Sequence, residues 1–304
     1  MASMTGAANP PAPPLTVSAI CIMLLLCLSW GINNVMVKLA LPEVPPLMQA
    51  AARSVGGLLV ILIASYLRGI PLFRRDGTLP AGLLMGTVFA VEFVLIFFGL
   101  QYTTASRAVI FLYTAPFVVA FGAVNLLGER LRGEQWAGLA LAFAGIVIAI
   151  GVPQADVDAR VLFGDLLLIL GALGWGLTTL IFKMSNLSKA PAEKTLIYQT
   201  GVSAPLLTLG SLGLGETLAQ VPGPVALVSL AYQTIWVVGI TFLLWYSLMK
   251  TYAASKLTAF TFVTPLFGVL AGHIVLDEPI SLAFAVAVAF VIAGLFLVNR
   301  PART

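Results

Sequence analysis

The chain has 304 residues, of which 60% are hydrophobic and 9% are charged, and its net charge is +4. Soluble domains carry roughly 25% charged residues, so this composition excludes a water-soluble globule and indicates a polytopic membrane protein. A small positive excess is typical of loops that are retained on the cytoplasmic side of a membrane. No basic cluster long enough to follow a phosphate backbone is present, so no nucleic-acid partner is expected.

Apolar runs long enough to cross about 30 Å of hydrocarbon as helices occur ten times along the sequence. An uncharged, proline-rich segment precedes them, and we expect a disordered cytoplasmic tail over residues 1–15. The predicted spans are 16–38, 47–67, 79–101, 104–127, 134–152, 163–185, 193–212, 223–249, 256–276 and 280–298. The sequence therefore predicts an all-α fold of ten transmembrane helices that is surrounded by membrane lipid.

The first and sixth spans share one arrangement of polar residues. "SWGINNVMVK" and "GWGLTTLIFK" each place a tryptophan three and four residues before two polar residues, so all three lie on one helix face. Such a face is either the wall of a substrate cavity or a contact through which helices pack and hydrogen-bond. The residues are Trp30, Asn33 and Asn34 in the first span and Trp175, Thr178 and Thr179 in the sixth. Each stretch ends in a lysine, Lys38 or Lys183, which we expect to extend to the membrane interface.

Glu92 lies near the middle of the third span, in "FAVEFVLIFFG". A carboxylate at that depth costs several kcal/mol unless it is paired, hydrated or protonated. The residue is therefore either a protonatable group or ligand for a substrate ammonium, or a structural hydrogen-bonding partner of Asn33 or Asn34. Gly99, about two helical turns further along the same face, is a candidate hinge.

The fourth and ninth spans each contain a proline, Pro116 or Pro265, and each proline follows an aromatic residue by three positions, Tyr113 or Phe262. A proline removes a backbone hydrogen bond and bends a helix, and interrupted helices at corresponding positions point to a transport site. These aromatic residues, together with Trp245 and Tyr246 of the eighth span, either line a cavity or pack a core. Thr241, in the same span, occupies the position that corresponds to Glu92.

The two halves of the chain repeat each other. From Phe97 onward a constant offset of 149 residues aligns Pro116 with Pro265 and Glu129 with Glu278. Each repeat holds five spans, and because five is odd, the second repeat enters the membrane from the opposite side. The expected units are residues 16–152 and an inverted copy at 153–304, an architecture typical of carriers that alternate access.

Orientation follows from the basic residues. Four of the 16 Lys and Arg residues, namely Lys38, Arg53, Arg107 and Arg160, fall at or near one side, which leaves 12 on the side of the termini. Because basic residues concentrate in cytoplasmic loops, both termini are expected in the cytoplasm. Arg53 is either an anchor at the outer interface or a partner for a carboxylate.

The duplicated Trp-Gly element, and the "A-S-R/K … T/A-P … G/D-E" pattern that recurs in both halves, resemble the drug/metabolite transporter superfamily, EamA type. Within it, the sequence resembles bacterial exporters of aromatic and other neutral amino acids of the YddG type. The resemblance implies a basket-like carrier of the bacterial inner membrane. In it, spans 3, 4, 8 and 9 surround a central cavity, spans 1, 2, 6 and 7 flank it, and spans 5 and 10 join the halves. It also implies export of a small-molecule substrate.

Other function classes have less support. The sequence has no P-loop, no G-x-S-x-G and no H-E-x-x-H, and no His, Cys and carboxylate cluster with metal-ligand spacing. No catalytic residue, metal or cofactor is therefore expected, and a membrane-embedded enzyme is disfavoured. A broad-specificity drug or metabolite carrier, or one for nucleotide sugars, is the alternative, although anions would need more cations than Arg53 and Arg107. A monomer is expected, with a dimer as the alternative.

Overall fold

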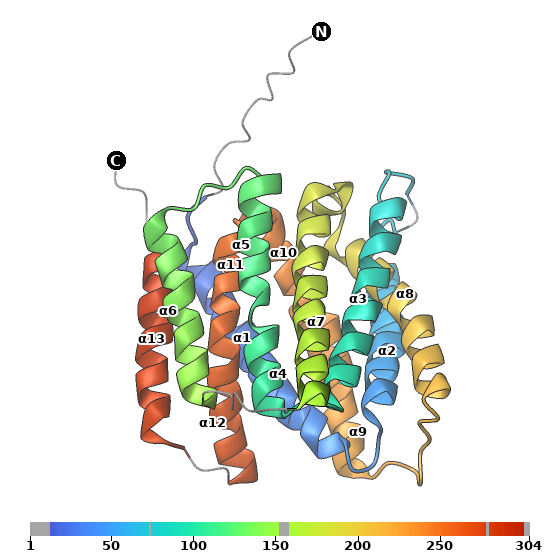
Figure 1. Ribbon diagram of the computed structural model, residues 1–304. Helices are drawn as coiled ribbons and strands as arrows, with labels where there is room; N and C mark the ends of the chain where they lie inside the picture. The colour runs from blue at the N-terminus through green and yellow to red at the C-terminus, as the bar shows by residue number, and fades with distance from the viewer. Residues whose placement is uncertain (1–12, 73, 152–157, 278–279, 301–304) are drawn as a thin grey trace.

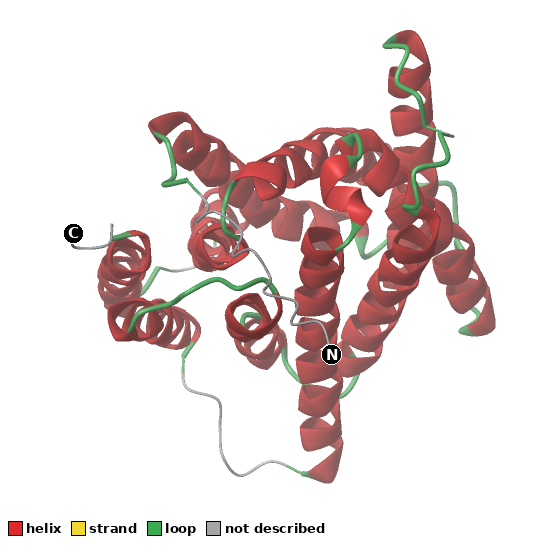
Figure 2. Ribbon diagram, turned by 90° about the horizontal axis from the view of Figure 1, so that it is seen from above, coloured by secondary structure: helices red, strands yellow, loops and turns green. Residues whose placement is uncertain are grey.

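A computed structural model describes residues 13–72, 74–151, 158–277 and 280–300. These residues form helices and loops and contain no β-strand (Figure 2), which confirms the predicted all-α fold. The α-helices are α1 Val17–Ala40, α2 Pro46–Leu67, α3 Leu79–Leu100, α4 Ala105–Leu112, α5 Ala115–Leu126, α6 Gly133–Ile150, α7 Ala159–Met184, α8 Ala192–Gly213, α9 Pro224–Ala231, α10 Phe242–Thr251, α11 Ala254–Phe260, α12 Thr264–Leu276 and α13 Leu282–Asn299. The remaining helical segments are η1 Asn186–Lys189, the π-helix η2 Tyr232–Thr241 and the 3₁₀ turn η3 Thr261–Val263.

These helices make up the ten predicted spans. The fourth span consists of α4 and α5, the eighth of α9, η2 and α10, and the ninth of α11, η3 and α12. Within the described residues, nine spans are long and apolar enough to cross a membrane by composition alone. The remaining span, α8, turns its polar residues inward, since Lys194, Gln199 and Thr200 are buried. It therefore crosses as a more polar helix that neighbouring helices shield from lipid.

The interruptions of the fourth and ninth spans fall at corresponding positions. α4 ends at Leu112, and Pro116 is the second residue of α5. α11 ends at Phe260, and Pro265 is the second residue of α12. Proline lacks the N–H that a continuous helix would need there, but fits the first turn of a new helix. Both prolines therefore begin the second half of a broken span, as the sequence predicts.

The fifth spans of the two halves, α6 and α13, show how the halves are related. They lie side by side and run in opposite directions in Figure 1. A Cβ atom on Gly138 would lie 2.6 Å from the carbonyl oxygen of Gly294, and one on Gly294 would lie 2.5 Å from that of Gly138. Only glycine permits this backbone approach. Equivalent helices that run antiparallel are what an inverted repeat requires.

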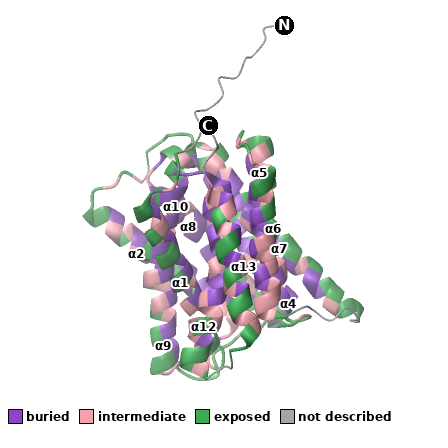
Figure 3. Ribbon diagram, turned by 90° about the vertical axis from the view of Figure 1, so that its left-hand side faces the viewer, coloured by how far each residue is buried: buried purple, intermediate pink, exposed green. Residues whose placement is uncertain are grey.

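Burial follows the membrane pattern. Figure 3 shows exposed and intermediate residues along the outer faces of the helices and buried residues between them. Large apolar side chains such as Ile292 and Phe296 of α13 are more than 60% exposed, which is the arrangement expected of a surface in contact with lipid. The interior is then the only place where polar side chains are concealed from lipid.

Candidate functional site

The two helix interruptions meet where the two halves of the chain are in contact. Tyr113 follows the last residue of α4, and Phe262 is the middle residue of η3. Their ring centroids lie 6.4 Å apart, although the residues are 149 positions apart in the sequence. The two positions that the repeat makes equivalent are thus in contact across the interface between the halves.

Further aromatic rings extend from this pair, and we refer to the set as the break cluster. Tyr113 makes an edge-to-face contact with Trp175 of α7 at 5.9 Å. Phe262 is fully buried and lies 6.2 Å from Phe117 of α5 and 6.4 Å from Phe143 of α6. The cluster thus combines residues from both halves. Of the aromatic residues grouped from the sequence it contains Tyr113 and Phe262, whereas Trp245 contacts Trp30 and Tyr246 contacts Phe182.

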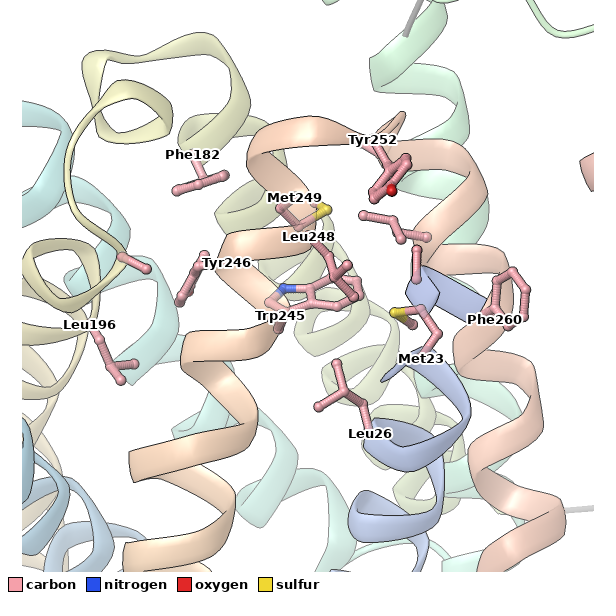
Figure 4. Close-up of a cluster of buried hydrophobic side chains, with 14 of the residues drawn as sticks. Met23, Leu26, Phe182, Leu196, Trp245, Tyr246, Leu248, Met249, Tyr252 and Phe260 are labelled. Carbon is pink, nitrogen blue, oxygen red and sulfur yellow. The ribbon is translucent and has the colours of Figure 1, made fainter. Parts of the chain in front are cut away.

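A second group, the Trp30 cluster, joins α1 to the eighth span. Trp30 donates its indole N–H to Thr241 Oγ1 at 3.0 Å and makes an edge-to-face contact with Trp245 at 5.6 Å. Figure 4 shows Trp245 directed toward Leu26 of α1, whereas Tyr246 points the other way, toward Leu196 of α8. Thr241 also donates to the carbonyl oxygen of Val237 at 2.6 Å, so its hydroxyl is held by two hydrogen bonds.

The polar residues that follow the two tryptophans have different environments. Thr178 and Thr179 are buried, and each donates its hydroxyl to the carbonyl oxygen of Trp175, at 2.7 and 3.3 Å. Bonds of this type satisfy the hydroxyl donor within its own helix, while each hydroxyl oxygen can still accept a further hydrogen bond. Asn34 is exposed, whereas the buried Oδ1 atom of Asn33 has no hydrogen-bond partner in the described structure.

Glu92 is buried between α3 and α7. A Cβ atom on Gly174 would lie 3.0 Å from Glu92 Cβ, so the carboxylate-bearing side chain leaves α3 at a point of close contact with α7. Glu92 Oε2 has no hydrogen-bond partner among the described residues, and no bond joins Glu92 to Asn33 or Asn34 there. The structural hydrogen bond considered from the sequence is therefore not found.

Arg53 and Tyr246, both named from the sequence, lie near Glu92, together with Gln199, which the sequence did not single out. Arg53 of α2, considered from the sequence only as an anchor or a carboxylate partner, interacts electrostatically with Glu92. Tyr246 of α10 also interacts electrostatically with Glu92, and it donates its hydroxyl to Gln199 Oε1 at 2.5 Å. Gln199 lies in a polar segment of α8, which is the only sequence signal that could have pointed to it.

Two further expectations concern backbone mobility and the interface lysines. Gly99 packs closely on α7, because a Cβ atom there would lie 2.9 Å from Leu168 Cγ. Lys183 does not simply extend outward: its ammonium donates to the carbonyl oxygen of Tyr252 at 2.6 Å.

No sequence signal pointed to the π-helix η2 that ends at Thr241, a type of segment that often occurs at functional sites.

Ten spans in two inverted halves, with interrupted helices that meet between the halves, define a membrane transporter of the carrier type. The chain belongs to the EamA-like transporter family, whose model matches residues 17–151 and 162–300. It is thus a multi-pass membrane transporter of a small molecule and not an enzyme.

The chain is similar to several bacterial proteins. It is 28% identical to the uncharacterized transporter YvbV of Bacillus subtilis, over 91% of this chain and 90% of that protein. It is 26% identical to a "Probable amino-acid metabolite efflux pump" of Escherichia coli, over 90% of this chain and 92% of that protein. A crystal structure at 23% identity covers 93% of this chain and 96% of its own, with a TM-score of 0.79, and supports the fold.

Proposed function

We propose that this transporter exports aromatic and other neutral amino acids, or closely similar metabolites, from the cytoplasm. The observation that carries the proposal is the contact between Tyr113 and Phe262, at the two helix interruptions. It places aromatic surface at the interface between inverted halves, which is where carriers of this architecture bind substrate. The similarity to proteins named as probable amino-acid metabolite efflux pumps supports the same substrate class.

Substrate contact is assigned to residues of the two aromatic clusters and to the polar groups beside them. Aromatic rings supply apolar surface at low conformational cost, and neutral polar groups fix the ends of a small molecule. Thr178 and Thr179 donate their hydroxyl hydrogens within their own helix, which leaves their oxygen atoms able to accept a hydrogen bond from the substrate. The assigned residues are Trp30, Asn33, Asn34, Glu92, Tyr113, Trp175, Thr178, Thr179, Thr241, Trp245, Tyr246 and Phe262.

Access alternates by bending at the interruptions. Pro116 and Pro265 leave one backbone carbonyl in each broken span without its helical donor, so the two halves of each span can change their angle at little cost. Gly99 is a third hinge, where α3 moves against α7. Closing one end while opening the other then exposes the same substrate site to each side in turn.

The proposal includes a placement in the membrane. The units 16–152 and 153–304 act as the two inverted halves, the protein functions as a monomer, and both termini face the cytoplasm of a bacterial inner membrane. Lysine and arginine are concentrated on that side. Accessibility of single cysteines introduced at exposed loop positions of a variant without Cys21 and Cys27 tests this topology.

A counterflow assay tests the substrate class. Liposomes that contain the purified protein are loaded with an unlabelled compound. Uptake of the same compound in labelled form is then measured for phenylalanine, threonine, a sugar phosphate and a cationic dye. We expect exchange of phenylalanine and threonine only. Exchange of the dye would support the broad-specificity alternative, exchange of the sugar phosphate would support an anion carrier, and absence of amino-acid exchange would refute the proposal.

A further inference from the structure

Arg53 and Glu92 are opposite charges at the same depth of the bundle. Arg53 lies seven residues (53 − 46) from the start of α2, and Glu92 lies eight residues (100 − 92) from the end of α3. With a rise of 1.5 Å per residue, both lie about 11 Å from the end where α2 begins and α3 ends. Their exposed fractions are 7% and 8%, so both are more than nine-tenths buried.

The two charged groups are close but are not joined. The guanidinium carbon of Arg53 lies 4.4 Å from the ring centre of Phe93, the residue that follows Glu92 in α3. The two charges interact electrostatically, yet in the described structure no ion pair within 4.0 Å connects them. In contrast, Arg107 and Asp165 do form such a pair. Glu92 Oε2 also has no hydrogen-bond partner there.

Separated buried charges of this kind are costly unless a third group satisfies both. A zwitterion does so in one step, because it carries both complementary charges a few ångströms apart. We infer that Arg53 and Glu92 hold the head group of an α-amino acid, with its carboxylate on Arg53 and its ammonium on Glu92. This inference rests on the proposed function and specifies which part of the substrate is recognised and by which residues.

The local chemistry suits each half of the head group. A guanidinium binds a carboxylate through two parallel N–H donors, and stacking on Phe93 holds its plane while leaving its edge available. Glu92 supplies acceptor oxygens for an ammonium. Tyr246 near Glu92 and Phe93 against Arg53 provide aromatic surface next to the head group, and the substrate side chain packs there.

This two-point arrangement predicts discrimination by charge. A ligand with only an ammonium leaves Arg53 buried without a partner, and a ligand with only a carboxylate leaves Glu92 in the same state. Rejection of such ligands follows because the unsatisfied group carries the penalty. Sugar phosphates and cationic dyes are excluded by the same logic.

The test measures how well three ligands compete with labelled phenylalanine in counterflow by the protein in liposomes. The ligands are phenylalanine, phenylethylamine, which lacks the carboxylate, and 3-phenylpropionate, which lacks the ammonium. For the unmodified protein we expect each analogue to bind at least about tenfold more weakly than phenylalanine. In Arg53→Gln, the binding of phenylalanine should weaken by at least about tenfold, while the binding of phenylethylamine should not change. In Glu92→Gln, the binding of phenylalanine should weaken by the same factor, while the binding of 3-phenylpropionate should not change.

Matched controls separate recognition from folding. Arg68→Gln and Glu134→Gln make the same chemical changes at side chains that are 65% and 44% exposed, and should leave all ligand preferences unchanged. Thermal unfolding identifies variants that fail to fold. If Arg53→Gln or Glu92→Gln fails, Arg53→Lys and Glu92→Asp replace them, and each should weaken phenylalanine selectively relative to the analogue that lacks the corresponding contact.

The outcomes distinguish this inference from the proposed function. The inference alone would be overturned if phenylalanine is exchanged but the two analogues compete equally well with it. It would also be overturned if the variants weaken the binding of all three ligands by the same factor. The same holds if Glu92→Gln keeps its preference for phenylalanine over 3-phenylpropionate and loses only its dependence on a pH gradient. An unmodified protein that exchanges no amino acid would overturn both.

Discussion

Tyr113 and Phe262 occupy equivalent positions in the two halves, and their ring centroids lie 6.4 Å apart at the helix interruptions. Aromatic pairs in this range contribute about 0.5–1.5 kcal/mol beyond the area they bury. The contact therefore connects the halves at the point where both interrupted spans change direction.

Tyr113→Ala and Phe262→Ala should each lower the free energy of unfolding in detergent, by about 3–5 kcal/mol for the fully buried Phe262. The double variant should lose less than the sum, with a coupling of about 0.5–1.5 kcal/mol. Tyr113→Phe keeps the ring and should retain counterflow. Strict additivity of the two alanine variants would show that the rings act independently.

Pro116→Ala and Pro265→Ala should slow exchange because each restores a backbone donor that can make its broken span continuous. We expect about tenfold slower counterflow, equivalent to 1.4 kcal/mol on the barrier, with unchanged or higher thermal stability. Pro80→Ala is the matched control, since Pro80 is also the second residue of a helix but lies at the start of an unbroken span. Normal rates in both variants would remove the hinge assignment.

The hydrogen bond from Trp30 to Thr241 connects α1 with the second half. Trp30→Phe and Thr241→Val should each reduce the free energy of unfolding by about 0.5–1.5 kcal/mol. In the double variant the second substitution should add little, because the bond is already absent. Chemical unfolding followed by circular dichroism measures the cycle. Full additivity would mean that the bond contributes nothing to stability.

Gly294→Ala should destabilise the protein by about 1–3 kcal/mol, since the new Cβ atom would lie 2.5 Å from the carbonyl oxygen of Gly138 and force α6 and α13 apart. Gly201→Ala is the matched control in α8, where the nearest atom would be 3.8 Å away. Alanine favours a helix over glycine, so this control should be neutral or stabilising by about 0.5–1 kcal/mol. Thermal midpoints that change equally in both variants would contradict this packing.

Asp76, in the loop between α2 and α3, accepts hydrogen bonds from Lys194 and Thr78, and these partners lower its pKa from 3.8 to about 2. Because the folded pKa is the lower one, the contribution to stability is present above pH 3.8 and is lost as the pH falls through about 2. Asp76→Asn should therefore lower the thermal midpoint near neutral pH, and the difference from the unmodified protein should shrink between those two values. A difference that does not depend on pH in that window would refute the linkage.

The sequence alone determined the number of spans, their interruptions and their inverted relation. Hydrophobic length and proline chemistry act locally, so the break at Pro116 and its counterpart at Pro265 could be predicted from each segment by itself. A constant offset and an odd number of spans per repeat then implied inversion, which the antiparallel packing of α6 and α13 bears out.

Only the tertiary structure decided which polar groups meet. Helix periodicity places Glu92 on a face, but the rotation and depth of α2 decide that Arg53 lies beside it, over Phe93. The same holds for Trp30 and Thr241, which are 211 residues apart, and for Tyr246 and Gln199. Such contacts depend on the relative rotation of helices distant in the sequence, which no single segment encodes.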